Sequence, residues 1–175
     1  NGAAVDVGDV APNGHIVTQE MVEGAQLYLS VLPTVSPGLL NIETRVHIPS
    51  VHHTCYGTPD TWFFDHASHT LNIYDYKFGH RYVEEYENLQ CILYAEGIML
   101  KLAEQYGVGE GEFDQKVTVR ITIVQPRCYY KGEPVRTWEF NGAQVRGYIN
   151  QLKMAADRAM SPDPVATTSE EACRN

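Results

Sequence analysis

The sequence contains no long uninterrupted apolar segment. A membrane-spanning helix needs about 18 or more largely apolar residues, and the longest candidate, residues 92–102, contains Glu96 and Lys101. The first six residues (NGAAVD) also lack a basic region followed by an apolar stretch, so we expect no membrane span and no signal peptide. Because the chain does not begin with methionine, we interpret it as an excised or processed fragment.

Paired cysteines and an excess of positive charge are also missing. The four cysteines, at positions 55, 91, 128 and 173, form no C-x-x-C pair, which argues against a zinc finger or a disulfide scaffold. Reduced thiols in an intracellular protein are the simplest interpretation. Thirteen Lys and Arg against 22 Asp and Glu give a net charge of −9, which argues against nucleic-acid binding through a bulk positive field. This balance still allows an enzyme that grips DNA through bound cations and a few placed basic groups.

The length and hydropathy pattern predict one mixed domain over residues 1–175, with an irregular segment at 1–16 and a mobile tail at 161–175. Helices are predicted at 19–31, after Thr18 as N-cap, and at 84–106, before Gly107, with a last helix at 142–160. Strands are predicted at 41–48, 57–64, 71–77, 117–124 and 135–140. The order α-β-β-β-α-β, with an added strand and helix, predicts an α/β (α+β) fold with a mixed central sheet flanked by helices.

The predicted hairpin around the loop at 65–70 brings two acidic residues together. Opposed residues of an antiparallel pair have a constant index sum, and a symmetric loop here places Asp60 opposite Asp75. Their Cβ atoms would lie about 5 Å apart on one face of the sheet. Two carboxylates so placed repel each other, so the pattern indicates a cation between them.

Lys77 shares the face of Asp75, because side chains alternate along a strand, and projects roughly 7 Å along from it. Hard oxygen ligands with open positions favour Mg²⁺ or Mn²⁺ over zinc. Such a cation can polarise a phosphodiester and lower the pKa of its bound water. Lys77 could orient that water or stabilise developing negative charge.

The following helix adds a second feature. Gln90 and Tyr94 lie four residues apart and therefore on one helical face, where the amide and the hydroxyl could reach a phosphate or a base. Arg81, in the segment Gly79-His80-Arg81, adds a small basic cluster beside Lys77.

Three segments carry a family resemblance: Gly57-Thr58-Pro59-Asp60, then Asp75-Tyr76-Lys77, then Gln90 to Tyr94. They resemble the G-x-x-D, D-x-K and Q-x-x-x-Y motifs of RecB-like, lambda-exonuclease-like nucleases in the PD-(D/E)XK superfamily. Residues 123–127 (IVQPR) and 171–174 (EACR) are similar to those of a largely uncharacterised phage and prophage branch. The similarity covers roughly residues 17–173, and the order and spacing of the motifs are fairly specific.

The resemblance implies a restriction-endonuclease-like core and Mg²⁺- or Mn²⁺-dependent cleavage of DNA, commonly exonucleolytic, in phage recombination or replication in the host cytoplasm. It implies that Asp60, Asp75 and the carbonyl of Tyr76 bind the metal and that Lys77 is the catalytic lysine. Gln90 and Tyr94 would then position the DNA. DNA is the implied partner, and a homo-oligomer and a phage recombination protein are further partners that it allows.

Two departures from the family pattern leave alternatives open. Relatives usually carry an upstream His or Glu that completes the site, and nothing before Asp60 fits that pattern; Glu20, Glu23 or Glu43 could substitute, and we favour Glu43. Relatives also tend to carry several C-terminal cysteines, sometimes with an iron–sulfur site, whereas this chain has only Cys173 there. The competing hypothesis is therefore a catalytically silent nuclease-like module that binds nucleic acid or serves as an interaction part of a phage complex.

Overall fold

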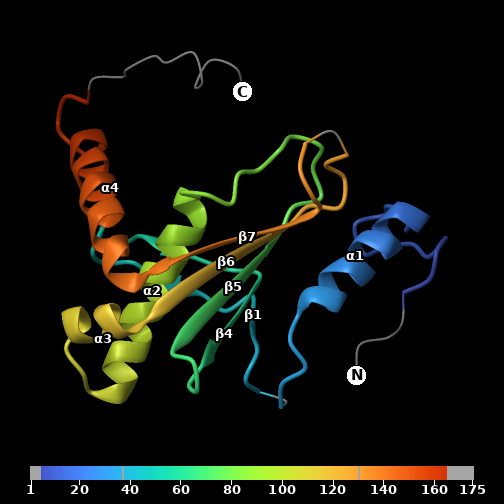
Figure 1. The fold of residues 1–175 in the computed structure, drawn as a ribbon. Helices are drawn as coiled ribbons and strands as arrows, with labels where there is room; N and C mark the ends of the chain where they lie inside the picture. The colour runs from blue at the N-terminus through green and yellow to red at the C-terminus, as the bar shows by residue number, and fades with distance from the viewer. Residues whose placement is uncertain (1–4, 37, 130, 165–175) are drawn as a thin grey trace.

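A mixed five-stranded sheet runs through the centre of the molecule (Figure 1). The computed structural model describes residues 5–36, 38–129 and 131–164. The sheet has the order β1-β4-β5-β6-β7, formed by β1 (Asn41–Ile42), β4 (Thr61–Asp65), β5 (Thr70–Tyr76), β6 (Thr118–Val124) and β7 (Val135–Asn141). Neighbouring strands are antiparallel except β5 and β6, which are parallel. The mixed α+β prediction is confirmed at this level.

The hairpin of β4 and β5 has the register that the symmetric loop predicts. Thr61 pairs with Tyr74 and Asp65 with Thr70, so every opposed pair has the index sum 135. Toward the loop each predicted strand is one residue too short, because β4 runs to Asp65, β5 begins at Thr70 and only residues 66–69 form the turn. Toward Gly57 the first predicted strand is too long, because residues 58–60 lie outside β4. Asp60 and Asp75 therefore lie one step beyond the Thr61–Tyr74 pair.

The two faces of the sheet carry different helices (Figure 1). On one face, the alternating side chains of β5 and β6, such as Leu71, Ile73, Val119 and Ile121, are fully buried in the hydrophobic core. Helix α2 (Leu89–Tyr106) contributes most of the opposing core side chains. On the other face, α1 (Gln19–Val31), which begins after the predicted N-cap Thr18, packs against the end of β5.

The predicted strand at 41–48 is interrupted. After β1 the backbone turns at Glu43, where φ is +46°, and the chain resumes as β2 (Val46–His47), paired with β3 (Tyr56–Gly57) in a separate two-stranded sheet. This small sheet packs on α2, where Gly97 approaches so closely that an added Cβ would lie 2.9 Å from the carbonyl of His47. The packing of this small sheet on α2 therefore takes precedence over one continuous strand at 41–48.

The helix predicted at 84–106 begins five residues later than expected. Asn88 is the N-cap, and its side chain accepts a hydrogen bond from the Cys91 N–H, while Glu87 has a φ of +51° that a helix does not allow. The predicted stop is confirmed, since Gly107 adopts a left-handed φ of +64° and its N–H reaches the last-turn carbonyls.

Helix α3 (Glu110–Lys116) was not predicted. The last helix, α4 (Val145–Ala159), follows a short 3₁₀ turn at Gly142–Gln144 that is closed by a capping box from Asn141. Of the predicted tail, residues 165–175, including Cys173 and the 171–174 motif, lie outside the described residues. Within the described ranges, each helix is too short or too polar to cross a membrane.

Candidate active site

Two carboxylates meet at the open end of the β4–β5 hairpin, as the register predicts. Asp75 is 2% exposed and Asp60 is half-buried. Asp60 Oδ2 accepts a hydrogen bond of 2.7 Å from the backbone N–H of Tyr76, which fixes the acid against the partner strand. Burial raises the pKa of Asp75, and the negative charge of Asp60 raises it further. The two acids are therefore close enough to repel each other.

Lys77 contacts the buried member of this pair, Asp75. Its Nζ lies 2.9 Å from Asp75 Oδ2 and donates to Asp75 Oδ1 at 3.2 Å. Burial lowers the pKa of Lys77, but the hydrogen bond and the charge of Asp75 together leave it above the ordinary value. The ammonium also donates to Gln90 Oε1 at 2.9 Å. Lys77 therefore remains protonated and links the sheet to α2.

The first turns of α2 continue this chain of contacts. Gln90 donates from Nε2 to the Tyr94 hydroxyl at 2.8 Å, as expected for residues four apart on one face. The Tyr94 ring packs on Gly57, where an added Cβ would lie 2.5 Å from Tyr94 Cε1. Gly57 of the first motif and Tyr94 of the third are thus in direct contact, and only glycine leaves room for the ring.

The donor atoms fit a hard cation in part. Asp75 Oδ2 is buried and has no aligned hydrogen bond, although Lys77 Nζ is within ion-pair distance, so this oxygen retains a lone pair for a ligand. Carboxylate and carbonyl oxygens, here those of Asp60, Asp75 and Tyr76, suit Mg²⁺ or Mn²⁺. Across the described ranges, no group of three or more His, Cys, Asp or Glu side chains is placed to hold a metal.

The three upstream acids do not complete such a group. Glu43 contacts the site through its backbone, since its N–H donates to the carbonyl of Asp60 at 3.0 Å, but its side chain is exposed. Glu20 instead accepts from Arg127 and Tyr129, and Glu23 accepts from Gln19 on the helix surface. The expectation that Glu43 lies within the first strand is wrong, because the backbone turns out of the sheet there.

Gln125 is fully buried beside the segment that follows Lys77. It belongs to the 123–127 segment of the resemblance, for which no role was predicted. Its Nε2 donates to the carbonyls of Gly79 and Arg81, and its Oε1 accepts from the N–H of Val83 and from Arg136. The side chain therefore fastens the segment between β5 and α2, on which the exposed Arg81 lies. A polar residue directly after the apolar strand β6 is a weak local signal that does not by itself indicate these long-range contacts.

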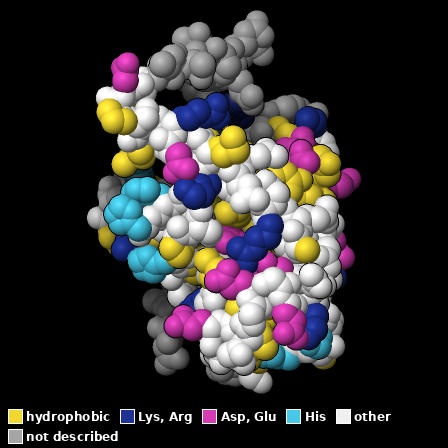
Figure 2. Space-filling view, turned by 90° about the vertical axis from the view of Figure 1, so that its left-hand side faces the viewer, with side chains coloured by type: hydrophobic (Ala, Val, Ile, Leu, Met, Phe, Trp, Pro, Cys, Tyr) yellow, Lys and Arg dark blue, Asp and Glu magenta, His cyan; other side chains and the backbone are white. Residues whose placement is uncertain are grey.

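A second cluster of charges lies away from the hairpin. Arg146 on α4 ion-pairs with the buried carboxylates of Glu96 and Asp114 and with the exposed Glu110. On this side of the molecule, basic and acidic side chains are interspersed (Figure 2). The face therefore offers no continuous positive surface for a phosphate backbone.

Comparison with known proteins places the chain in one family. A family model described as "Protein of unknown function (DUF2800)" matches residues 9–174. The chain is a DUF2800 protein. No curated protein and no solved structure matches it. The match spans the whole hairpin, α2 and the Gln125 segment of this DUF2800 protein, so the candidate site belongs to the family region.

Proposed function

We propose that this DUF2800 protein is a Mg²⁺- or Mn²⁺-dependent deoxyribonuclease with a restriction-endonuclease-like core of the PD-(D/E)XK superfamily. The observation that carries the proposal is the convergence of Asp60, Asp75 and Lys77 at the end of one hairpin, in the register expected for that chemistry. In the central sheet the chain order is α1, the antiparallel strands β1, β4 and β5, then α2 and the parallel strand β6, with the small β2–β3 sheet inserted after β1 and α3 inserted before β6. This order supports the core assignment.

Each site residue has a role in this proposal. Asp60, Asp75 and the Tyr76 carbonyl would hold the metal, which when bound would polarise the phosphodiester and supply a water of lowered pKa. Lys77, already protonated beside Asp75, would stabilise charge that develops on the phosphate. Gln90 and Tyr94 would position the phosphate backbone or the strand end, and Arg81 would add a nearby positive charge. Exonuclease action in phage recombination or replication, in the host cytoplasm, is the role that the motif resemblance favours.

The test is cleavage of linear and circular duplex DNA with Mg²⁺, Mn²⁺ or EDTA by wild type, Asp75→Asn and Lys77→Met. We expect a loss of about 10²-fold or more in both variants, as is usual when a group that stabilises transition-state charge is removed. Lys153→Met is the matched control, because Lys153 also pairs with an aspartate but lies exposed on α4. Consumption of linear DNA alone would identify an exonuclease. Wild type as inert as both variants, with either metal, would reject the proposal.

The alternative is a catalytically silent module that binds nucleic acid or a protein of a phage complex. One observation favours it: within the described residues the two carboxylates have no third acidic or imidazole partner, and Lys77 occupies one side of Asp75. Titration with Mn²⁺ separates the two functions without an activity assay. Mn²⁺ binding that Asp75→Asn removes supports the nuclease, whereas equal, weak binding by both proteins supports the silent module.

A further inference from the structure

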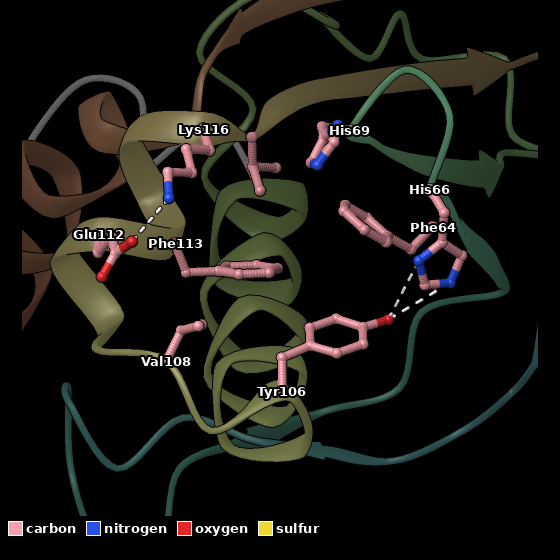
Figure 3. A pocket seen from close by; sticks show the side chains of 9 residues that line it. Phe64, His66, His69, Tyr106, Val108, Glu112, Phe113 and Lys116 are labelled. Atoms are coloured by element: carbon pink, nitrogen blue, oxygen red, sulfur yellow. Dashed lines mark hydrogen bonds and ion pairs between the residues drawn. The ribbon is translucent and has the colours of Figure 1, made fainter.

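A separate pocket lies at the opposite end of the β4–β5 hairpin from Asp60 and Asp75. It occupies about 260 Å³ between the hairpin turn, the end of α2 and α3 (Figure 3). Because β5 separates Thr70 at the turn from Asp75 by five residues at about 3.3 Å each, the pocket and the candidate active site are distinct places.

The walls of the pocket are mainly aromatic. The ring centroids of Phe64 and Phe113 lie 5.8 Å apart, and those of Tyr106 and Phe113 lie 6.0 Å apart in a stacked arrangement. Val108 and Val117 add aliphatic surface. Flat rings and methyl groups of this kind favour a planar apolar ligand.

The rim carries two imidazoles and one ammonium against a single carboxylate. In Figure 3, Lys116 and His69 lie along one edge of the pocket, and His66 lies beside the Tyr106 hydroxyl, 3.3 Å from His66 Nε2. Lys116 pairs with Glu112 at 2.6 Å, but both side chains are 62% exposed, so this pair exchanges readily with another anion.

The backbone at His69 sets the direction of this edge of the pocket. His69 ends the turn at residues 66–69 and has a φ of +51°, a left-handed conformation that histidine adopts more readily than most residues and that often closes hairpin turns. The conformation is held by the Thr118 N–H, which donates to the carbonyl of His69 at 3.0 Å. As a result the imidazole faces the pocket (Figure 3).

We propose that this pocket binds a small aromatic carboxylate. The ring would lie against Phe64 and Phe113, and the carboxylate would lie between His69 and Lys116. A cavity of about 150 Å³ lined by apolar side chains holds benzene, so about 260 Å³ admits one or two fused rings with an acid group. The proposal is independent of the nuclease function.

The probe is 2-naphthoate, whose binding to the full chain is followed by its own fluorescence anisotropy, with uncharged 2-naphthamide as the matched ligand. We expect the amide to bind about tenfold more weakly, since it lacks the charge-assisted contacts. His69→Asn, which keeps a residue tolerant of positive φ, and Lys116→Met should each weaken naphthoate binding several-fold. Glu112→Gln should strengthen it, because it removes the competing anion.

Lys153→Met is the control, since Lys153 forms the same i,i+4 type of ion pair on α4 but does not line the pocket. It should leave naphthoate binding unchanged. Equal binding of acid and amide, no binding of the acid, or equal losses in Lys116→Met and Lys153→Met would overturn the proposal. Circular dichroism of each variant establishes that a loss of binding is not a loss of fold.

Discussion

At the scale of single residues, burial of the Asp75 carboxylate costs the folded protein free energy at neutral pH. Burial raises the pKa of Asp75 above its ordinary value of 3.8, so the folded state holds that proton more tightly than the unfolded chain does. The contribution of Asp75 to the free energy of unfolding therefore falls as the pH rises from the pKa of the unfolded chain to the raised pKa of the folded one. Above the raised pKa the loss of stability is complete. At neutral pH the ionised Asp75 opposes folding even beside Lys77.

Asp75→Asn should therefore raise the melting temperature at pH 7.5, because the amide carries no charge to bury. Each kcal/mol gained corresponds to about 2–4 °C for a chain of this size, and thermal unfolding followed by circular dichroism measures it. Asp157→Asn, on the exposed surface of α4, is the control and should give no gain. A lower melting temperature for Asp75→Asn would show that the ion pair with Lys77 outweighs the burial.

Gly57→Ala should disturb the other half of the site. The new Cβ would lie 2.5 Å from Tyr94 Cε1, so the ring must move away and the Gln90–Tyr94 hydrogen bond must break or bend. We expect a loss of about 1–3 kcal/mol in urea unfolding, as for other overpacked positions. Gly147→Ala, in open space on helix α4, should instead gain up to about 1 kcal/mol.

At the scale of elements, the sequence predicts what depends on local pattern. Strict alternation in residues 117–124 located β6, and the symmetric turn around residues 66–69 set the hairpin register. Prediction failed where distant contacts decide. Glu43 leaves the sheet because Val46 and Ile48 must cover Gly97 of α2, and nothing within residues 41–48 signals that contact.

The role of Gln125 was beyond prediction for the same reason. A lone glutamine after a strand is ordinary surface in most proteins, and only the tertiary structure brings it to carbonyls more than 40 positions earlier in the chain. By contrast, the convergence of Asp60, Asp75 and Lys77 needed only the two-residue repeat of a strand and one turn.

Gln125→Leu should loosen the segment before α2. The substitution leaves the Val83 N–H, two carbonyls and one Arg136 contact without their partner, and buried polar groups left unpaired cost about 1–3 kcal/mol each. Hydrogen–deuterium exchange should quicken in residues 79–88 while that in β6 and β7 stays slow. The control is Gln115→Leu, an exposed position on α3. Equal changes in both variants would contradict the role of Gln125 in holding the segment between β5 and α2.

At the scale of the whole molecule, acidic side chains outnumber basic ones and some of them are buried. The net charge is −9, and Glu96, fully buried, has one carboxylate oxygen without a hydrogen-bond partner. Burial raises the pKa of Glu96 and of Asp114, while Arg146 and Ser50 only partly oppose the shift at Glu96. The fold should therefore lose stability as the pH rises from about 4.5 toward neutrality.

Glu96→Gln should flatten this dependence. The variant should match wild type near pH 4.5 and exceed it at pH 7.5, because the wild-type protein must bury an ionised carboxylate at the higher pH whereas the amide stays neutral. Urea unfolding at both pH values measures the difference. Glu104→Gln, an exposed position on the same helix, should follow the wild-type curve; a parallel rise in both variants would mean that overall charge repulsion, not burial of Glu96, sets the trend.

The parallel pairing of β5 with β6 has a consequence for synthesis on the ribosome. The hairpin that carries Asp60 and Asp75 is complete by Tyr76, yet the strand that seals Asp75 from water begins only at Thr118. During translation both acids therefore emerge hydrated, and their dehydration waits until α2, α3 and β6 have left the exit tunnel. A nascent chain stalled before residue 118 would carry Asp60 and Asp75 but would lack β6, which buries Asp75 in the folded protein.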